Sequence, residues 1–182
     1  MKLNIILDID GTLIHNNTPR PHLEYFLEEC FKHFKNVSIW TASSKNWCNH
    51  VNNNIFQPII DNINKKHNKT YRFDFVFNAS KCTTYRSPYE MYPVTEKRLR
   101  KLHRSKRFTD YTVENTLIVD DTRTTYCRCN YGNAIPIKSF YTFSKEHDTE
   151  LLKLVKYLKE IIIPHFDVYK TIRNIEKRGW NV

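Results

Sequence analysis

Two apolar segments of the sequence each end in a pair of carboxylates. Asp8 and Asp10 follow the run LNIIL, and Asp120 and Asp121 follow the run NTLIV. Both runs are too continuous for a half-exposed strand and too short for a helix, which is typical of buried parallel strands. In parallel α/β sheets ligands bind at the carboxyl ends of the strands, so we expect the four acids to lie together.

Four carboxylates at one edge of a sheet repel one another unless a cation lies among them. Their hard oxygen atoms suit Mg²⁺, which usually keeps several water ligands and accepts only a few protein oxygens. The sequence therefore predicts a magnesium site formed by Asp8, Asp10, Asp120 and Asp121.

These residue types are suited to phosphoryl transfer. Ionised Asp8 can attack a phosphorus atom to form an aspartyl-phosphate. Asp10 can protonate the leaving group and then deprotonate the water that hydrolyses the intermediate. Thr41 ends the apolar run NVSIW, and its hydroxyl, with nearby backbone amides such as that of Ala42, can hold phosphate oxygens at the start of a helix.

A cationic side chain should complete such a site. We choose Lys97, which opens a basic segment before the second acidic run, and keep Lys101, one helical turn later, as the alternative. Arg86, beside Ser87 and Pro88, either binds substrate phosphate or covers the surface. Among the aromatic residues, Trp40 is expected in the core. Others are candidates for a pocket that takes a proline or a base: Trp47, Tyr85, Tyr89 and Tyr92.

The remaining patterns alternate between strand and helix. Apolar residues at spacings of three and four predict a helix over RPHLEYFLEECFKHF, and another over DTELLKLVKYLKEIII that Pro164 should break. VTEKRLRKLH is expected to be helical with Val94, Leu99 and Leu102 toward the core. Further strands are predicted at NVSIW, RFDFVFN and NAIPI. The order predicts an α/β fold with a doubly wound, Rossmann-like parallel sheet and helices on both faces.

The 182 residues are enough for one domain. We expect a catalytic domain over residues 1–163, with a small insertion at 52–92 that begins with an Asn- and Lys-rich surface excursion at 52–70. Residues 164–182 are expected to form a basic helix or tail.

Composition limits the setting and the partners. No apolar run approaches a membrane span, no leader pattern follows Met1, and the five cysteines are scattered without a Cys-x-x-Cys pair, Cys127 and Cys129 included. We therefore expect an intracellular protein of the cytoplasm or nucleus. The net charge of +10 favours phosphate-rich or acidic partners, nucleic acid among them, although lysine enrichment of the genome explains it equally well.

The order of these motifs resembles the haloacid dehalogenase superfamily, whose four motifs match DIDGT, Thr41, Lys97 and the Asp120–Asp121 pair. Within it the chain is similar to the Fcp1-homology or small C-terminal-domain phosphatase branch. The stretches that carry this resemblance are DIDGTLIH, RPHLEYFLEECFKHFKNVSIWTAS, EKRLRKL, VDDTRTTY, GNAIPIKSF and DTELL.

The resemblance implies roles for particular residues. It implies that Asp8 and Asp121 bind Mg²⁺ through their side chains, Asp10 through its backbone carbonyl, that Asp120 supports the site, and that Lys97 is the motif lysine. It also implies removal of phosphate from serine or threonine in proteins, as on the repeat tail of RNA polymerase II.

Two departures bear on the substrate. Gly11 stands where the branch usually has Glu, and only a short link, residues 15–20, joins the first motif to the next helix. So short a link provides no large cap domain, which favours a large substrate that excludes water with its own surface. A phosphoprotein is the leading candidate. The alternatives are a nucleic-acid 3′-phosphate, a small-molecule phosphate and a binding module without activity.

Overall fold

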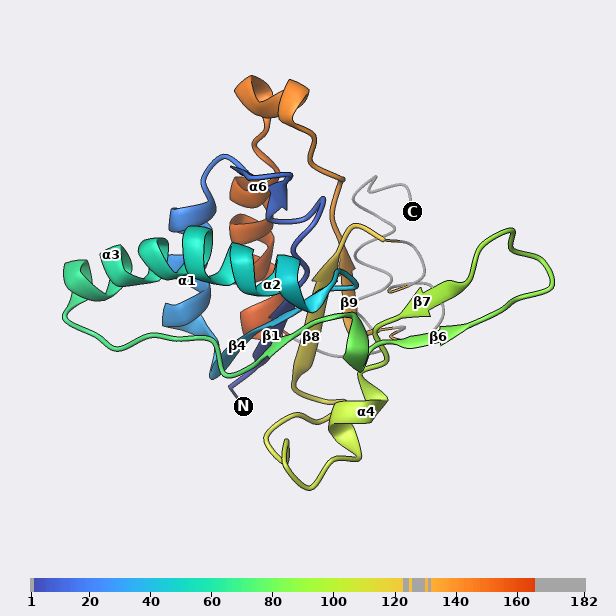
Figure 1. Ribbon diagram of the computed structural model, residues 1–182. Coiled ribbons are helices and arrows are strands. Elements are labelled where there is room, and N and C mark those ends of the chain that lie inside the picture. The colour runs from blue at the N-terminus through green and yellow to red at the C-terminus, as the bar shows by residue number, and fades with distance from the viewer. Residues whose placement is uncertain (1, 123–124, 126–129, 131, 166–182) are drawn as a thin grey trace.

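The computed structural model describes residues 2–122, 125, 130 and 132–165. Five parallel strands form the central sheet in the order β5-β4-β1-β8-β9 (Figure 1). Their bounds are β1 Asn4–Leu7, β4 Asn36–Trp40, β5 Val76–Phe77, β8 Thr116–Asp120 and β9 Ala134–Pro136. Leu7 pairs with Ile39 of β4 and Val119 of β8, so the carboxyl ends of these strands are level. The predicted α/β fold is confirmed, with both acidic runs on adjacent strands.

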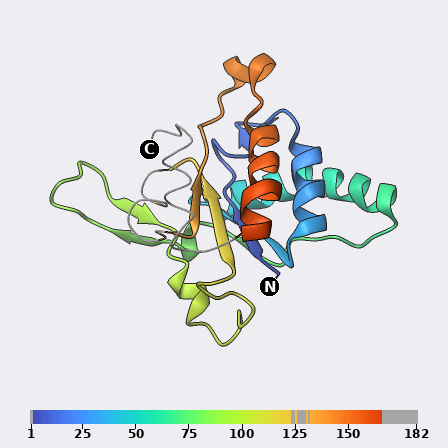
Figure 2. The same ribbon diagram turned by 180° about the vertical axis from the view of Figure 1, so that it is seen from behind.

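The long helices cover one face of the sheet, where α1 and α6 lie side by side (Figures 1 and 2). Ile5 and Leu7 of β1 and Val119 of β8 point into this layer and pack against the buried faces of the helices. The helices are α1 Leu23–His33, α2 Lys45–Val51, α3 Gln57–His67, α6 Glu150–Tyr157 and α7 Ile163–His165.

The opposite face has a different covering in the described residues. Ile6 and Ile118 point to this side and pack with Leu99, Leu102 and Tyr111. The packing elements here are the short helix α4, Arg100–His103, and the loop that follows it. A cluster of rings extends this second core toward β5: Phe75, Phe77, Phe108 and Tyr111.

Two helices continue through a proline because a π-helical segment precedes it. The segment at Asn52–Phe56 leads into α3, whose second residue is Pro58, and the segment at Leu158–Ile162 leads into α7, whose second residue is Pro164. The wider π turn accommodates the missing N–H and the ring clash with the carbonyl four residues earlier. The helix therefore includes Pro164 and His165, and the residues after His165, where the expected break would show, lie outside the described part of the chain.

The Asn- and Lys-rich segment is helical instead of being an irregular surface excursion. Phe56, Ile60 and Ile63 are buried in the first core, while the Asn and Lys side chains lie mainly on the outer face. The polar composition masked an apolar stripe at helical spacing.

Two short hairpins complete the described fold. One pairs β2, Ile14–His15, with β3, Thr18–Pro19, and occupies the link after the first motif. The other pairs β6, Thr83–Tyr85, with β7, Val94–Glu96, and projects from the body of the molecule (Figure 1). The helix expected from Val94 is thus wrong at its start, because β-branched Val94 and Thr95 pair with β6. Val94, Leu99 and Leu102 are nevertheless buried, as expected.

Two 3₁₀ helices, Ala79–Lys81 and Thr142–His147, lie in loops. Among the described residues, no helix is both long and apolar enough to cross a bilayer. Cys127, Cys129 and most of the expected C-terminal helix or tail lie outside the described residues.

Candidate active site

Three of the four predicted carboxylates, Asp8, Asp120 and Asp121, lie together at the ends of β1 and β8. The backbone N–H of Asp8 donates to the carbonyl of Val119 at 3.0 Å, which aligns the two strand ends. Asp8, Asp120 and Asp121 each present an oxygen, and these atoms lie within 4.8 Å of one another. Asp8 and Asp120 are buried, whereas Asp121 is partly exposed.

Lys97 is the cation at this cluster. Its Nζ forms hydrogen-bonded ion pairs with Asp8 Oδ1 and, at 2.6 Å, with Asp120 Oδ2, and the residue is buried. Buried Asn130 fixes the local backbone, because its amide donates to the carbonyl of Lys97 at 2.6 Å and accepts from the N–H of Leu99 at 2.9 Å. Lys101 instead donates to the carbonyls of Lys81 and Cys82. The geometry therefore places Lys97 in the site.

The pairing sets the charge on these groups. Burial raises the pKa of Asp8, an effect that Lys97 opposes and Asp120 reinforces. Burial disfavours the charged form of Lys97, but Asp8 and Asp120 together overcome this and raise the pKa of its amine. Lys97 is consequently a fixed positive charge beside Asp8.

Gly11 permits the close approach of Asp121. Its φ of +79° lies in the left-handed region, and a Cβ built there would collide with the Asp121 carboxylate. That carboxylate accepts hydrogen bonds from Thr12 Oγ1 at 3.1 Å and Ser139 Oγ at 2.7 Å. The Glu that the similar branch carries at this position does not fit this backbone.

Asp10 is held by residues that follow β4. Its Oδ2 accepts hydrogen bonds from Thr41 Oγ1 at 3.3 Å and Ser43 Oγ at 2.6 Å, and its Oδ1 accepts one from Trp47 Nε1 at 2.7 Å. Ser44 caps α2 by accepting from the N–H of Trp47, which places the indole over the site. Sequence reasoning missed the roles of Ser43 and Trp47, for which the only signal was a capping serine three residues before a tryptophan.

A cavity of about 110 Å³ joins these groups. Four residues in its wall were not anticipated: Ser43, Thr95 from β7, Thr122 and Thr125. The full lining is Asp8, Asp10, Thr41, Ala42, Ser43, Thr95, Lys97, Thr122 and Thr125. Predicted residues Thr41, Ala42 and Lys97 therefore face the acids across one space. Arg86 does not line this cavity and is exposed on the β6–β7 hairpin.

The acidic cluster suits a divalent metal. With all groups ionised, Asp8, Asp120 and Asp121 together with Lys97 carry two more negative than positive charges, which one divalent cation balances. All the donor atoms are hard carboxylate oxygens, the ligands that Mg²⁺ prefers.

Comparison with known proteins decides the family. The family model described as NLI interacting factor-like phosphatase matches residues 3–169. The chain belongs to this phosphatase family. Its members are phosphoric monoester hydrolases of the haloacid dehalogenase type, a class that uses a divalent metal.

The curated relatives of this chain include one phosphatase, under the same name, from several animals. The chain is 28% identical over 167 residues to the ubiquitin-like domain-containing CTD phosphatase 1 of Danio rerio, and 25% identical over 168 residues to that of Homo sapiens. Each alignment covers 86% of this chain and 49% of the relative. The chain thus spans about half the length of the curated relatives it matches.

Two solved phosphatase structures share the fold. The fission yeast RNA polymerase II CTD phosphatase Fcp1 bound to beryllium fluoride matches with a TM-score of 0.52 at 16% identity, over 97% of this chain and 56% of that one. A second structure of Fcp1 matches with a TM-score of 0.50 at 16% identity, over 100% and 55%. At this identity the likeness establishes the fold alone.

Proposed function

We propose that this chain is a Mg²⁺-dependent phosphatase that hydrolyses phosphomonoesters through an aspartyl-phosphate at Asp8, with phosphoserine or phosphothreonine in proteins as its substrate. The observation that carries the proposal is that Asp8, paired with Lys97, lines the same cavity as Asp10 and Thr41. A nucleophile, a fixed cation and a second carboxylate thereby face one space.

In the first step Asp8 attacks phosphorus and the bond to the leaving oxygen breaks, with Asp10 giving its proton to that oxygen. Lys97 neutralises charge on the transferring group, and Thr41 with the backbone of Ala42 holds its oxygens. In the second step Asp10 takes a proton from water, which attacks the phosphoaspartate and releases inorganic phosphate. Asp8, Asp121 and the backbone carbonyl of Asp10, with Asp120 in support, would hold Mg²⁺, which would supply further positive charge next to the phosphate.

Hydrogen bonds to Asp10 position it for both proton transfers. Trp47 and the hydroxyls of Ser43 and Thr41, all from the segment that follows β4, donate to its carboxylate, whereas Asp8 pairs with Lys97. Asp10 and Asp8 thus have different surroundings, which suits two carboxylates with two roles.

The shape of the site favours a macromolecular substrate. The 110 Å³ cavity holds little more than a phosphoryl group and its attachment, well below the roughly 300 Å³ or more of typical small-molecule pockets. The β2–β3 hairpin is too short to form a cap. The substrate's own surface would therefore exclude water, and the names of the curated relatives support a phosphoprotein.

A nucleic-acid 3′-phosphate is the second candidate, and the net charge of +10 favours it. Both substrates use the same catalytic residues. Their salt dependence differs. Binding of a nucleic acid releases counterions from its phosphates, and this release becomes less favourable as the salt concentration rises, so the affinity falls steeply.

A substrate panel distinguishes these candidates. Phosphoserine peptides, 3′-phosphorylated single-stranded oligonucleotides and an aryl phosphate are assayed with Mg²⁺ at low and moderate salt. The proposal predicts higher kcat/KM on the peptides, with shallow salt dependence. Turnover of the oligonucleotides alone, with a steep loss of activity in salt, contradicts the proposal that the substrate is a protein. It does not contradict the proposed catalytic steps.

A further inference from the structure

A strongly basic surface follows the segment that carries Lys97. Residues 97–109 contain seven lysine or arginine residues and no acid. Two of the seven have carboxylate partners, Lys97 in the active site and Arg98 at 2.6 Å from Glu96. Others are exposed and form no ion pair with a carboxylate among the described residues. These side chains, with exposed Lys81 beside them, make up what we call the α4 surface: Lys81, Arg100, Arg104, Lys106 and Arg107.

The acids of the loop between α4 and β8 do not neutralise the α4 surface. Asp110 pairs with Lys35 at 2.9 Å. Glu114 acts on His103, although burial of the imidazole outweighs it and lowers the pKa of His103. The α4 surface therefore carries a local excess of positive charge, which attracts anionic groups.

The backbone under the α4 surface is fixed. Leu99 is buried in the second core, and its N–H donates to the Asn130 side chain at 2.9 Å. Lys101 donates hydrogen bonds of 2.9 Å to the carbonyls of Lys81 and Cys82, which joins α4 to the 3₁₀ helix Ala79–Lys81. Because the backbone is already ordered, an anion that binds here pays only for ordering the long basic side chains.

The α4 surface adjoins the catalytic cavity on two sides. Lys97 lines the cavity and precedes Arg100 by three residues. The thiol of Cys82 donates to the carbonyl of Thr41 at 3.7 Å, and Thr41 also lines the cavity. An extended chain covers about 3.3 Å per residue, so a polypeptide with one phosphate in the cavity reaches the α4 surface within a few residues.

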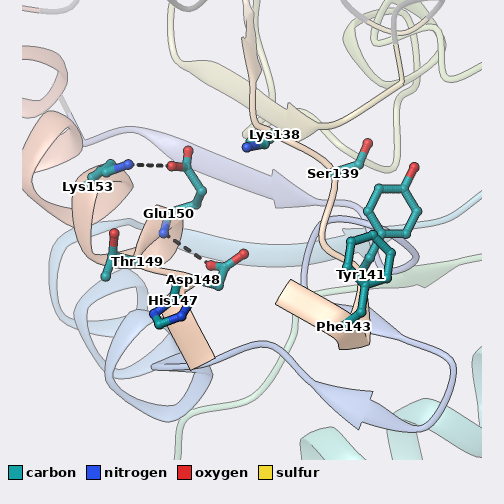
Figure 3. Close-up of a pocket in the computed structure, with 9 residues that line it drawn as sticks. All are labelled: Lys138, Ser139, Tyr141, Phe143, His147, Asp148, Thr149, Glu150 and Lys153. Carbon is teal, nitrogen blue, oxygen red and sulfur yellow. Dashed lines mark hydrogen bonds and ion pairs between the residues drawn. The ribbon is translucent and has the colours of Figure 1, made fainter. Parts of the chain in front are cut away.

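The side of the active site near Asp121 has a different charge pattern. Ser139 donates to Asp121 at 2.7 Å and lines a larger cavity of about 570 Å³ between β9 and α6 (Figure 3). In this cavity Glu150 pairs with Lys153 at 2.6 Å, and Asp148 pairs with a buried arginine at 2.9 Å. Since positive and negative groups are mixed there, a chain of phosphates is better accommodated by the α4 surface.

The chemistry of the α4 surface favours phosphates carried by a polypeptide. Three of its five cations are arginines, whose planar forks match the oxygens of a phosphate. Nucleic acids also carry phosphates, but sites for single strands usually offer open aromatic faces to the bases. The rings beside this surface are covered instead: the Arg107 guanidinium lies 5.5 Å from the centroid of Phe108, and the Lys81 ammonium lies 6.0 Å from that of Phe77.

We propose that the α4 surface binds a second phosphoserine or phosphothreonine of the substrate polypeptide while the first occupies the catalytic cavity. This inference rests on the proposed function and narrows its substrate to polypeptides with several phosphates. The second phosphate strengthens and speeds the encounter through complementary charge and takes no part in the chemical steps.

Peptides with two anionic groups test the inference. One peptide carries a phosphoserine and, three, six or nine residues away on either side, a phosphonate analogue of phosphoserine whose carbon–phosphorus bond is not hydrolysed. The comparison peptide carries serine in place of the phosphonate. The wild type should prefer the phosphonate peptide about 3–10-fold in kcat/KM at one or more spacings, the effect of a few exposed ion pairs. Glutamate at the same position should give a smaller preference, because a carboxylate carries less charge.

Two charge-matched variants locate the effect. Arg104→Gln/Arg107→Gln should lose most of the preference. Lys65→Gln/Lys69→Gln removes the same charge from exposed positions at the end of α3, which lies away from α4 (Figures 1 and 2), and should keep the preference. Thermal melts check the folding of each protein, and Arg104→Gln alone is the second variant if the double variant is unstable.

Several outcomes overturn the inference. One is a wild type without a preference at any spacing, and another is an equal preference in the wild type and the folded arginine variants. An equal loss in Lys65→Gln/Lys69→Gln would assign the effect to net charge. A loss confined to the binding of single-stranded oligonucleotides would assign the α4 surface to nucleic acid. The proposed function fails separately, if the wild type hydrolyses neither the singly phosphorylated peptide nor aryl phosphate.

Discussion

Lys97 donates a 2.6 Å hydrogen bond to Asp120 while also pairing with Asp8, so one buried ammonium joins the ends of β1 and β8. Substitution of Lys97 by Met should lower phosphatase kcat at least about 100-fold, because it removes the fixed cation next to the transferring phosphoryl group. The measurement is aryl phosphate turnover with a thermal melt of each variant. Lys101→Met serves as the control, since the Lys101 ammonium donates to the backbone carbonyls of Lys81 and Cys82, and should stay within about twofold of the wild type. Equal losses in both variants contradict the assignment of Lys97.

Trp47 should matter to catalysis through Asp10. Trp47→Phe keeps the ring and removes the donor to Asp10 Oδ1, so kcat should fall about 10–150-fold, the effect of one hydrogen bond to a charged group, with KM little changed. Steady-state kinetics on an aryl phosphate give both constants. His50→Phe is the control, because His50 stacks on Trp47 without contacting Asp10, and an equal loss there would point to packing instead of the hydrogen bond.

Gly11 should tolerate no side chain. Gly11→Ala places a Cβ against Asp121 at a positive φ, so we expect a loss of about 1–2 kcal/mol in unfolding free energy. We also expect weaker Mg²⁺ binding, so that half-maximal activity requires more Mg²⁺. Chemical denaturation and a Mg²⁺ titration measure the two effects. Unchanged stability together with an unchanged Mg²⁺ titration would show that the turn relaxes freely.

Glu28 should make stability depend on pH. It pairs with Lys32 of α1 and with Lys66 and His67 of α3, and hydrogen bonds from Lys32 and then Lys66 lower its pKa from 4.5 to about 2. A lowered pKa in the folded state means that the stabilisation is present above pH 4.5 and disappears as pH falls toward 2.

Glu28→Gln should therefore destabilise the fold by about 1–2 kcal/mol at pH 7, and the difference from wild type should shrink below pH 4.5. Urea denaturation at several pH values measures this difference. Glu24→Gln, exposed on the same helix, is the control. A difference that stays constant from pH 7 to pH 3 contradicts the role of the ion pairs.

The sequence was sufficient for the sheet and for the acids because both depend on local patterns. Continuous apolar runs ending in Asp8 and Asp120 specify buried parallel strands, and their adjacency follows from the α/β topology. The same local patterns did not predict the secondary structure around Lys97. A basic stretch with apolar residues at helical spacing resembled one helix. Val94–Glu96 instead pair with a strand eleven residues earlier, and such pairing depends on contacts that a local pattern does not contain.

The contacts of Asp10 and Asp121 were also beyond sequence reasoning. Ser139 and Trp47 reach these acids from segments distant in the chain, and neither belongs to a motif with a fixed spacing to the first strand. The π-helical segment that carries the helix up to Pro164 was not predicted either, because it is a backbone adjustment without a residue signature.

The central claim is that Asp8 is the nucleophile of a Mg²⁺-dependent phosphatase. The most direct measurement compares aryl phosphate turnover by the wild type with Mg²⁺, the wild type with a chelator, and Asp8→Asn with Mg²⁺, each checked for folding by circular dichroism. The account predicts turnover in the first case alone, with losses of about 1,000-fold or more in the other two. Turnover that persists in folded Asp8→Asn, or in the wild type without a divalent ion, would contradict it.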